Sequence, residues 1–319
     1  MEQRRLGDSG LVVSAIGLGC NNLGRPGTFT ASPEGARAVV CAAVDAGITY
    51  FDVADVYGSP RGRSEELLGH SLAGRRDCVV IGTKFGMDMH GANGHDFGAR
   101  GSRPYIRRAV ESSLRRLGTD WIDLYQLHRP DPSTPLVETL STLDDLVHEG
   151  KIRYIGLGNL AGWQLADAMW TARSNGLTTP ISAQNRYSLL DRDAEREILP
   201  ACMRFSLGLL PYTPLANGLL TAKYRYGEPP PAGTRLANRQ QLLDDAPWPR
   251  IEKVRTLAAA RAIGMLDLAI GWLAAQPHVG SVIAGATSVD QVLANAAVRW
   301  RPNETDGATI DDICPPGIR

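Results

Sequence analysis

The stretches FDVADVYG (residues 51–58), CVVIGTKFG (78–86) and WIDLYQLHRPD (121–131) decide the predicted fold. Each contains an apolar run typical of a buried strand, followed by residues typical of a loop. Polar side chains stand where the strands are expected to end: Asp52, Tyr57, Lys84 and His128. If the strands are parallel neighbours, these four side chains share one edge of the sheet.

Short apolar runs alternate with helical periodicity along the rest of the chain. Strands separated by helices favour parallel pairing, and a regular repeat without a linker favours a (β/α)₈ TIM barrel made of one domain, residues 1–319. LGDSGL (6–11) predicts an N-terminal β-hairpin that closes the barrel floor. Residues 86–101 and 217–249 are predicted to be long loops at the opposite, C-terminal face. The eight strands are expected to end near Gly19, Val53, Lys84, Leu127, Leu157, Gln184, Pro211 and Ile283.

Helix boundaries are marked by familiar residues. Ser32 and Ser102 are typical N-cap residues, each followed by a proline in the first helical turn. Gly47 and Gly118 are typical of helix C-termini. A doubly wound sheet is the alternative fold, but its GxGxxG fingerprint would fall on residues 17–22, GLGCNN, which lack the third glycine.

Composition narrows the classes of partner. The 319 residues include 34 basic and 34 acidic side chains, so no charge excess indicates nucleic acid or an acidic membrane surface. The N-terminal region has no apolar segment of signal or membrane-spanning length, and a cytoplasmic protein is expected. A small molecule is the expected partner, and the sequence does not indicate an oligomeric state.

No metal site or disulfide framework is predicted. The five cysteines are scattered and form no CxxC pair, so we interpret them as free thiols. Residues 88–96 contain two histidines and two aspartates, but they lack a recognised ligand spacing. A solvated loop is the simpler interpretation.

The four polar residues at the strand ends suit proton transfer to a carbonyl oxygen. A phenol is a weak acid, with a pKa of about 10, and a neighbouring ammonium lowers that pKa. Lys84 is expected to do this for Tyr57, while Asp52 keeps Lys84 charged and oriented. His128 is expected to donate a hydrogen bond to the carbonyl.

Other interpretations of each residue stay open. Tyr57 could close a turn, Asp52 and Lys84 could form a purely structural ion pair, and His128 could be a buried, hydrogen-bonded histidine. Lys84 could also act as a Schiff-base nucleophile in a lyase or aldolase. The joint placement of the four residues favours the proton-transfer hypothesis.

The chain resembles the aldo-keto reductases. FDVADVYG is similar to the family's FDTAxxYG, GTKFG to its lysine strand end, and YQLHRPD to its histidine strand end. Further blocks follow in the family's order: RRLGDSGLVVSAIGLG (4–19), GKIRYIGLGN (150–159), QNRYSLLDR (184–192), YTPLANGLLTAKY (212–224) and GATSVDQVLANA (285–296).

This resemblance implies a barrel that uses a nicotinamide dinucleotide, typically NADPH with NADH as the alternative, to reduce an aldehyde or ketone or to oxidise the alcohol. The resemblance also implies that Tyr57 is the proton donor, that Lys84 and Asp52 adjust its pKa, and that His128 orients the carbonyl. Some barrels that resemble this family serve ion channels, so a cofactor-binding regulatory subunit is the alternative.

The resemblance also implies the cofactor contacts. Asn159 and Gln184 match the positions that hold the carboxamide, and Tyr212 matches the aromatic residue that stacks on the nicotinamide. The pyrophosphate loop and the phosphate and adenine end correspond to Pro214, Leu215, Gly218, Leu219, Gly285, Thr287, Ser288, Gln291 and Asn295.

Two positions depart from the family pattern. The usual Ser-Asn pair is Gly158-Asn159, and Thr287 stands where many relatives place a cation against the 2′-phosphate. Arg235 or Lys223 is expected to supply that charge. Substrate-pocket walls are expected from residues Asn21, Asn22, Phe85, Met87, Arg129, Trp248 and the tail after Trp300.

Overall fold

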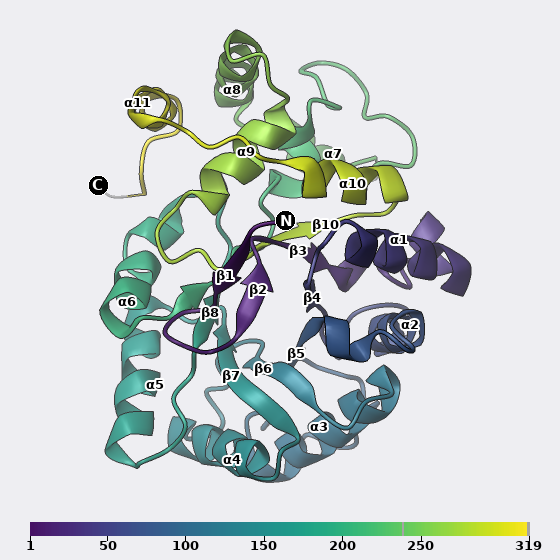
Figure 1. The fold of residues 1–319 in the computed structure, drawn as a ribbon, viewed down its shortest axis with the longest axis vertical. Helices are drawn as coiled ribbons and strands as arrows, with labels where there is room; N and C mark the ends of the chain where they lie inside the picture. Colours follow the sequence, from purple (N-terminus) through teal and green to yellow (C-terminus); the bar gives the residue numbers. More distant parts are fainter. Residues whose placement is uncertain (238, 318–319) are drawn as a thin grey trace.

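A computed structural model describes residues 1–237 and 239–317. Figure 1 shows strands in the middle of the molecule and helices around them. The strands are β1 Gln3–Arg5, β2 Val12–Ser14, β3 Ile16–Gly19, β4 Tyr50–Asp52, β5 Val80–Phe85, β6 Ile122–Leu127, β7 Ile152–Gly158, β8 Ser182–Gln184, β9 Gly208–Leu209 and β10 Val282–Gly285. The helices are α1 Pro33–Asp45, α2 Arg63–Ser71, α3 Arg103–Leu117, α4 Leu136–His148, α5 Gly162–Ser174, α6 Ile198–Phe205, α7 Gln240–Asp244, α8 Trp248–Ala260, α9 Met265–Ala274, α10 Val289–Ala297 and α11 Glu304–Ile313.

The strands form a closed parallel barrel. Eight of them pair in the order β10-β3-β4-β5-β6-β7-β8-β9, all parallel. The two ends of this order are joined, because Leu209 N donates to His278 O at 2.7 Å and Ile283 N donates to Pro211 O at 2.9 Å. The predicted (β/α)₈ barrel is therefore confirmed, and the doubly wound alternative, an open sheet, is wrong.

The predicted strand ends agree with the structure within two residues. Strands β3, β6 and β8 end at the expected residues, Gly19, Leu127 and Gln184. Strand β9 ends earlier than expected, at Leu209, although Leu210 N still donates to Ala183 O at 2.8 Å and Tyr212 N to Asn185 O at 3.1 Å. Pro211 has no N–H to donate, and it takes part in the barrel only through its carbonyl, which accepts from Ile283 N.

The predicted hairpin covers the floor of the barrel. Strands β1 and β2 pair antiparallel, with Gln3 opposite Ser14. Between them, Leu6 is fully buried in a cluster with Tyr50 of β4, Leu124 of β6 and Leu210, which directly follows β9. Since this apolar plug fills one end, a ligand can enter only from the other end.

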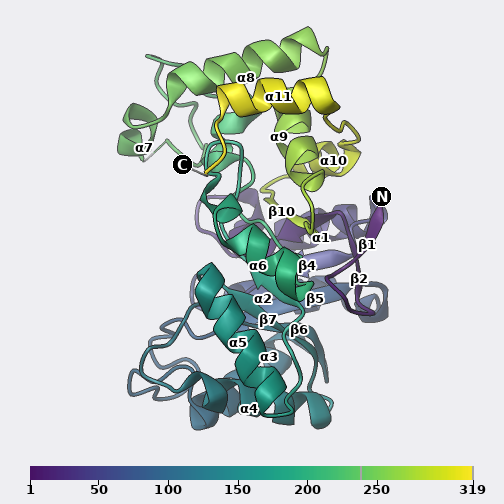
Figure 2. The same cartoon turned by 90° about the vertical axis from the view of Figure 1, so that its left-hand side faces the viewer.

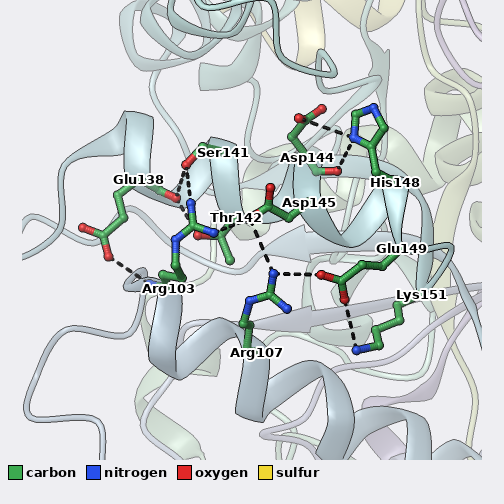
Figure 3. A network of polar contacts seen from close by, with 10 residues as sticks. All are labelled: Arg103, Arg107, Glu138, Ser141, Thr142, Asp144, Asp145, His148, Glu149 and Lys151. Carbon is green, nitrogen blue, oxygen red and sulfur yellow. Dashed lines mark hydrogen bonds and ion pairs between the residues drawn. The ribbon is translucent and has the colours of Figure 1, made fainter.

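Helices surround the barrel and pack against one another in sequence from α1 to α6, and α10 closes the ring against α1. Figure 2 shows α8 and α11 together at one end of the molecule. Between α3 and α4 lies the ion-pair network of Figure 3, in which Arg107 binds Glu149 at 2.8 Å and Lys151 binds Glu149 at 3.1 Å. Such partly exposed pairs each contribute about 0–1 kcal/mol.

Both predicted N-cap residues, Ser32 and Ser102, precede their helices as expected, but only one of the two side chains makes the capping hydrogen bond. Ser32 Oγ does accept from Gly35 N at 3.0 Å, as expected for an N-cap. Ser102 precedes α3, but its hydroxyl donates to Ala99 O at 2.7 Å. The first amide of α3, Arg103 N, instead donates to the Glu138 carboxylate at 2.9 Å, so a side chain from α4 replaces the local cap.

The long loops follow strands, as expected, but the second contains helical segments. Residues 86–101 are irregular, and Arg100 pairs with Asp96 at 2.6 Å and with Asp88 at 3.4 Å. Residues 217–249 include α7 and the start of α8. Within the described chain no single helix has the length and apolarity to cross a membrane; only α8 and α9 taken together do, and they meet at 94°.

Candidate active site

A cavity of about 620 Å³ opens where the barrel strands end, within the range typical of cofactor sites. Its wall combines the ends of strands with the loops that follow β3 and β9 and with the first part of α10. Asp52, Tyr57 and His128 line the cavity. Lys84 lies beneath them and is fully buried.

Lys84 and Asp52 form a buried ion pair. The Lys84 ammonium donates to Asp52 Oδ2 at 2.7 Å and to Val53 O at 2.8 Å, and the two side chains are 0% and 4% exposed. Two of the three ammonium protons are thus bound. The nitrogen also lies 5.0 Å from the ring centre of Tyr57, which places the positive charge beside the phenol.

The second oxygen of Asp52 is held by neighbouring strands. Asp52 Oδ1 accepts from Gln184 Nε2 at 2.7 Å and from the Tyr50 hydroxyl at 3.3 Å. Gln184 comes from β8, opposite β4 in the barrel, and also donates to Gln126 Oε1 at 3.3 Å. These contacts orient the carboxylate toward Lys84 before any ligand binds.

The protonation states differ in part from the sequence-based expectation. Burial is the largest single effect and lowers the pKa of Lys84, but Asp52 and Tyr57 together raise it more, so the pKa is raised on balance and the ammonium stays charged. For Tyr57, burial raises the pKa, and the Lys84 charge lowers it by less. The expected direction of the Lys84 effect is right, but the net pKa of Tyr57 is raised, so Tyr57 is a neutral phenol at pH 7.

His128 follows β6 and faces Tyr57, with the two rings edge to face and their centres 5.8 Å apart. Burial, and then the charges of Lys84 and Arg129, lower the pKa of His128 to about 3. The imidazole is therefore neutral at pH 7. Its buried Nδ1 has no hydrogen-bond partner in the described chain.

Asn159 and Tyr212 are bound to each other. The Tyr212 hydroxyl donates to Asn159 Oδ1 at 2.7 Å, and Asn159 Nδ2 donates to His128 O at 2.9 Å. The structure explains why glycine stands at position 158, before Asn159. A Cβ at Gly158 would lie 3.0 Å from the carbonyl oxygens of Leu127 and His128. The glycine therefore permits the close approach that lets Asn159 bind the His128 carbonyl.

The loop after β9 supplies another part of the wall. Pro214, Leu215 and Gly218 line the cavity, as expected of the predicted pyrophosphate loop, whereas Leu219 does not and is packed in the core. Gly218 has a φ of +97°, and a Cβ there would meet the end of the Lys223 side chain at 3.0 Å. The positive φ is what favours glycine here, because the flexible end of Lys223 could shift to relieve the contact.

Backbone amides at the start of α10 are already bound by side chains of the same segment. Gly285, Thr287, Gln291 and Asn295 line the cavity, whereas Ser288 does not. Ser288 is the N-cap, its Oγ accepting from Gln291 N at 3.3 Å. Thr287 N donates to the Gln291 side-chain oxygen at 2.8 Å. An anion that binds the Thr287 amide must therefore displace Gln291.

Cations line the cavity near the long loop. Arg25, Lys223 and Arg235 are all wall residues. Burial, followed by the charges of Arg25 and Arg239, lowers the pKa of Arg235, which indicates that Arg25 and Arg235 lie close together. These cations fit the phosphates of a dinucleotide.

Sequence reasoning missed some residues of the site and misplaced others. Arg25 was missed, although a cation in the loop after the first barrel strand was a visible signal. Tyr50 was missed too, although it precedes Asp52 by two residues and so shares its side of the strand. Phe85 is buried against Tyr125, and Trp248 is packed in the core, so neither forms the expected substrate wall. Asn21, Asn22 and Arg129 do line the cavity, whereas Met87 and the described part of the tail after Trp300 do not.

The arrangement is suited to acid catalysis on an oxygen atom. A neutral phenol, a buried ammonium and a neutral imidazole converge at the base of an open cavity. The phenol can give a proton, the ammonium can stabilise the phenolate that remains, and the imidazole can donate one hydrogen bond. The Lys84 amine is held as an ammonium by Asp52, which disfavours the Schiff-base alternative.

Comparison with known proteins identifies the family. Residues 15–313 match the model of the Aldo/keto reductase family. The chain is 35% identical to a probable voltage-gated potassium channel subunit beta of Oryza sativa subsp. japonica, over 92% of this chain and 90% of that protein. It is 34% identical to versiconal hemiacetal acetate reductase of Aspergillus parasiticus, over 95% of both chains, and 32% identical to L-glyceraldehyde 3-phosphate reductase of Escherichia coli (strain K12), over 92% and 86%.

The ion pair predicts an unequal response to two aspartate substitutions. Asp52→Asn leaves the buried Lys84 ammonium without its counter-charge, and we expect it to lower the free energy of unfolding by about 3–5 kcal/mol. Asp45→Asn is the control, because Asp45 pairs with Arg75 at 2.9 Å on the surface and should cost less than about 1 kcal/mol. Urea unfolding measures both, and equal losses would contradict the role given to Asp52.

Proposed function

The chain belongs to the aldo/keto reductase family, and on that premise we propose that it reduces an aldehyde or ketone with NADPH. The proposal rests most directly on one observation: a neutral Tyr57 phenol lies beside the buried Lys84 ammonium, at the base of a cavity large enough for a dinucleotide. The same residues can oxidise an alcohol when the oxidised cofactor prevails.

The role that we propose for each residue follows from its protonation state. The bound cofactor would supply the hydride. Tyr57 would donate its proton to the carbonyl oxygen, and the Lys84 charge would stabilise the phenolate that this leaves. His128, neutral at pH 7, would donate a hydrogen bond to the same oxygen and orient it. Asp52 would act through Lys84, without touching the substrate.

The residues around the cavity support a dinucleotide. Tyr212 borders the catalytic end, where it would stack on the nicotinamide, and Asn159 and Gln184 would hold the carboxamide through the hydrogen-bonding capacity that their present bonds leave free. Arg25, Lys223 and Arg235 would meet the phosphates. We assign Arg235 to the 2′-phosphate because Thr287 offers no charge at the position where many relatives have one.

A second candidate has its own support. The match to the rice protein named as a probable channel subunit beta is as extensive as the matches to reductases. The alternative is a regulatory subunit that binds the cofactor with little or no turnover. It predicts the same cavity but needs no proton donor, so turnover decides between them.

Replacing the proposed proton donor should abolish reduction and spare cofactor binding. In Tyr57→Phe, we expect kcat for a panel of small aldehydes and ketones to fall at least about 100-fold, because the phenolic proton is lost. NADPH oxidation is followed at 340 nm, and NADPH affinity by fluorescence titration.

Tyr226→Phe is the matched control, since Tyr226 is exposed on the long loop and should leave kcat unchanged. Tight NADPH binding without turnover by the wild-type protein would favour the regulatory subunit. Wild-type turnover that survives in Tyr57→Phe would overturn the assignment of the proton donor.

Removing the proposed 2′-phosphate partner should change cofactor preference. Arg235→Gln should weaken NADPH binding about 10-fold or more and NADH binding much less, because only NADPH carries the extra phosphate. Arg239→Gln is the control, because Arg239 is exposed and lies outside the cavity wall. Isothermal titration with both cofactors measures the effect, and an equal loss for NADPH and NADH would refute the assignment.

A further inference from the structure

The cavity wall carries an excess of positive charge. Its charged residues at pH 7 are Arg25, Asp52, Arg129, Lys223 and Arg235. Asp52 is the acidic member, and its charge is already balanced by Lys84 at 2.7 Å. In a chain with 34 basic and 34 acidic residues, four cations around one cavity are a local feature rather than a consequence of composition.

These cations fall into two groups. Besides burial, the charge of Arg25 lowers the pKa of Arg235, so these two lie close together, and Lys223 lies on the same loop as Arg235, beside Gly218. Arg129 belongs elsewhere: it directly follows His128, and its charge lowers the pKa of His128 and opposes the rise in the pKa of Tyr212. The proposed cofactor phosphates account for the first group and leave Arg129 unexplained.

Arg129 also lacks a partner within the protein. Across the described residues its side chain makes no ion pair and no hydrogen bond, and it is exposed to the cavity. The nearby Arg186 differs, because it binds Asp191 at 2.6 Å and does not line the cavity. The guanidinium of Arg129 is thus the cation at the catalytic end that is free to bind an incoming group.

We propose that Arg129 binds an anionic group of the substrate, so that the preferred substrates are aldehydes or ketones that carry a carboxylate or a phosphate. This inference rests on the proposed function, because it extends the carbonyl site at Tyr57 and His128. A guanidinium offers a planar pair of donors that matches both anions. Both His128 and Arg129 line the cavity, and the Arg129 charge acts on the His128 ring, so Arg129 is placed to bind a group a few bonds from the carbonyl that His128 orients.

Neither neighbour can take this role. His128 is neutral at pH 7, and Lys84 is buried beneath the wall with its charge balanced by Asp52. Arg129 therefore supplies the unbalanced charge at this end. It should act mainly on substrate binding, and so on KM, because it takes no part in the proton transfer assigned to Tyr57.

Matched pairs of aldehydes test the proposal. Methyl 4-formylbenzoate differs from 4-carboxybenzaldehyde only by an ester that removes the charge, and glycolaldehyde is the uncharged counterpart of glycolaldehyde phosphate. For wild type, we expect a lower KM for the charged member of at least one pair. Arg129→Gln should raise that KM about 10- to 100-fold and change kcat and the neutral KM less than about 3-fold. Arg129→Lys should restore part of the effect, and the two pairs distinguish a carboxylate from a phosphate.

Arg186→Gln is the matched control, because it removes a nearby charge that is already paired. If Arg186→Gln acts like Arg129→Gln, or if Arg129→Gln affects charged and neutral aldehydes alike, the proposal is wrong. It is wrong too if wild type does not prefer either charged aldehyde.

Calorimetric titration separates this inference from the proposed function. The same aldehydes are titrated into wild type and Arg129→Gln with NADP⁺ present, where no reduction takes place. Tighter binding of a charged aldehyde that depends on Arg129 supports the anion site even if the protein lacks turnover. Equal binding by the two proteins overturns the anion site even if neutral aldehydes are reduced.

Discussion

The ion pair between Lys84 and Asp52 is the interaction on which the site depends. It is almost fully buried, and such a pair is favourable only when hydrogen bonds satisfy its remaining polar atoms. Val53 O, Gln184 and Tyr50 supply those bonds. The pair therefore ties β4 to β5 and, through Gln184, to β8 across the barrel. It also holds a full positive charge beneath the Tyr57 ring.

Several residues other than glycine at the mouth of the cavity have left-handed backbone conformations, which are unfavourable for them. Asn159, Thr213 and Asn217 have positive φ values of 59°, 59° and 60°, and such residues cost about 1–3 kcal/mol each unless their surroundings hold them. Asn159 is held by its bonds to Tyr212 and His128 O. Backbone strain at the mouth of the cavity is typical of a surface that binds a ligand.

Much of the fold could be predicted because it depends on patterns local to the sequence. Apolar runs that end in a polar residue located the strands, and their parallel order placed Asp52, Tyr57, Lys84 and His128 together. What could not be predicted depends on distant neighbours. At the start of α3, the Glu138 carboxylate rather than the Ser102 hydroxyl accepts from a backbone amide. At the start of α10, the Gln291 side chain accepts from the Thr287 amide. The raised pKa of Tyr57 follows from its burial, which the residue types alone do not reveal.

Tyr57 is a neutral phenol beside a buried ammonium, and it is flanked by a neutral His128. The pH dependence of single-turnover carbonyl reduction by the NADPH-loaded protein tests these protonation states most directly. Because the pKa of Tyr57 is raised and that of His128 is about 3, neither group titrates between about pH 6 and 9. We expect a constant rate of reduction over that range, whereas the rate of alcohol oxidation, which needs the phenolate, rises with pH. A rate of reduction that falls with an inflection between pH 6 and 8, and loses that inflection in Tyr57→Phe or His128→Gln, would contradict these protonation states.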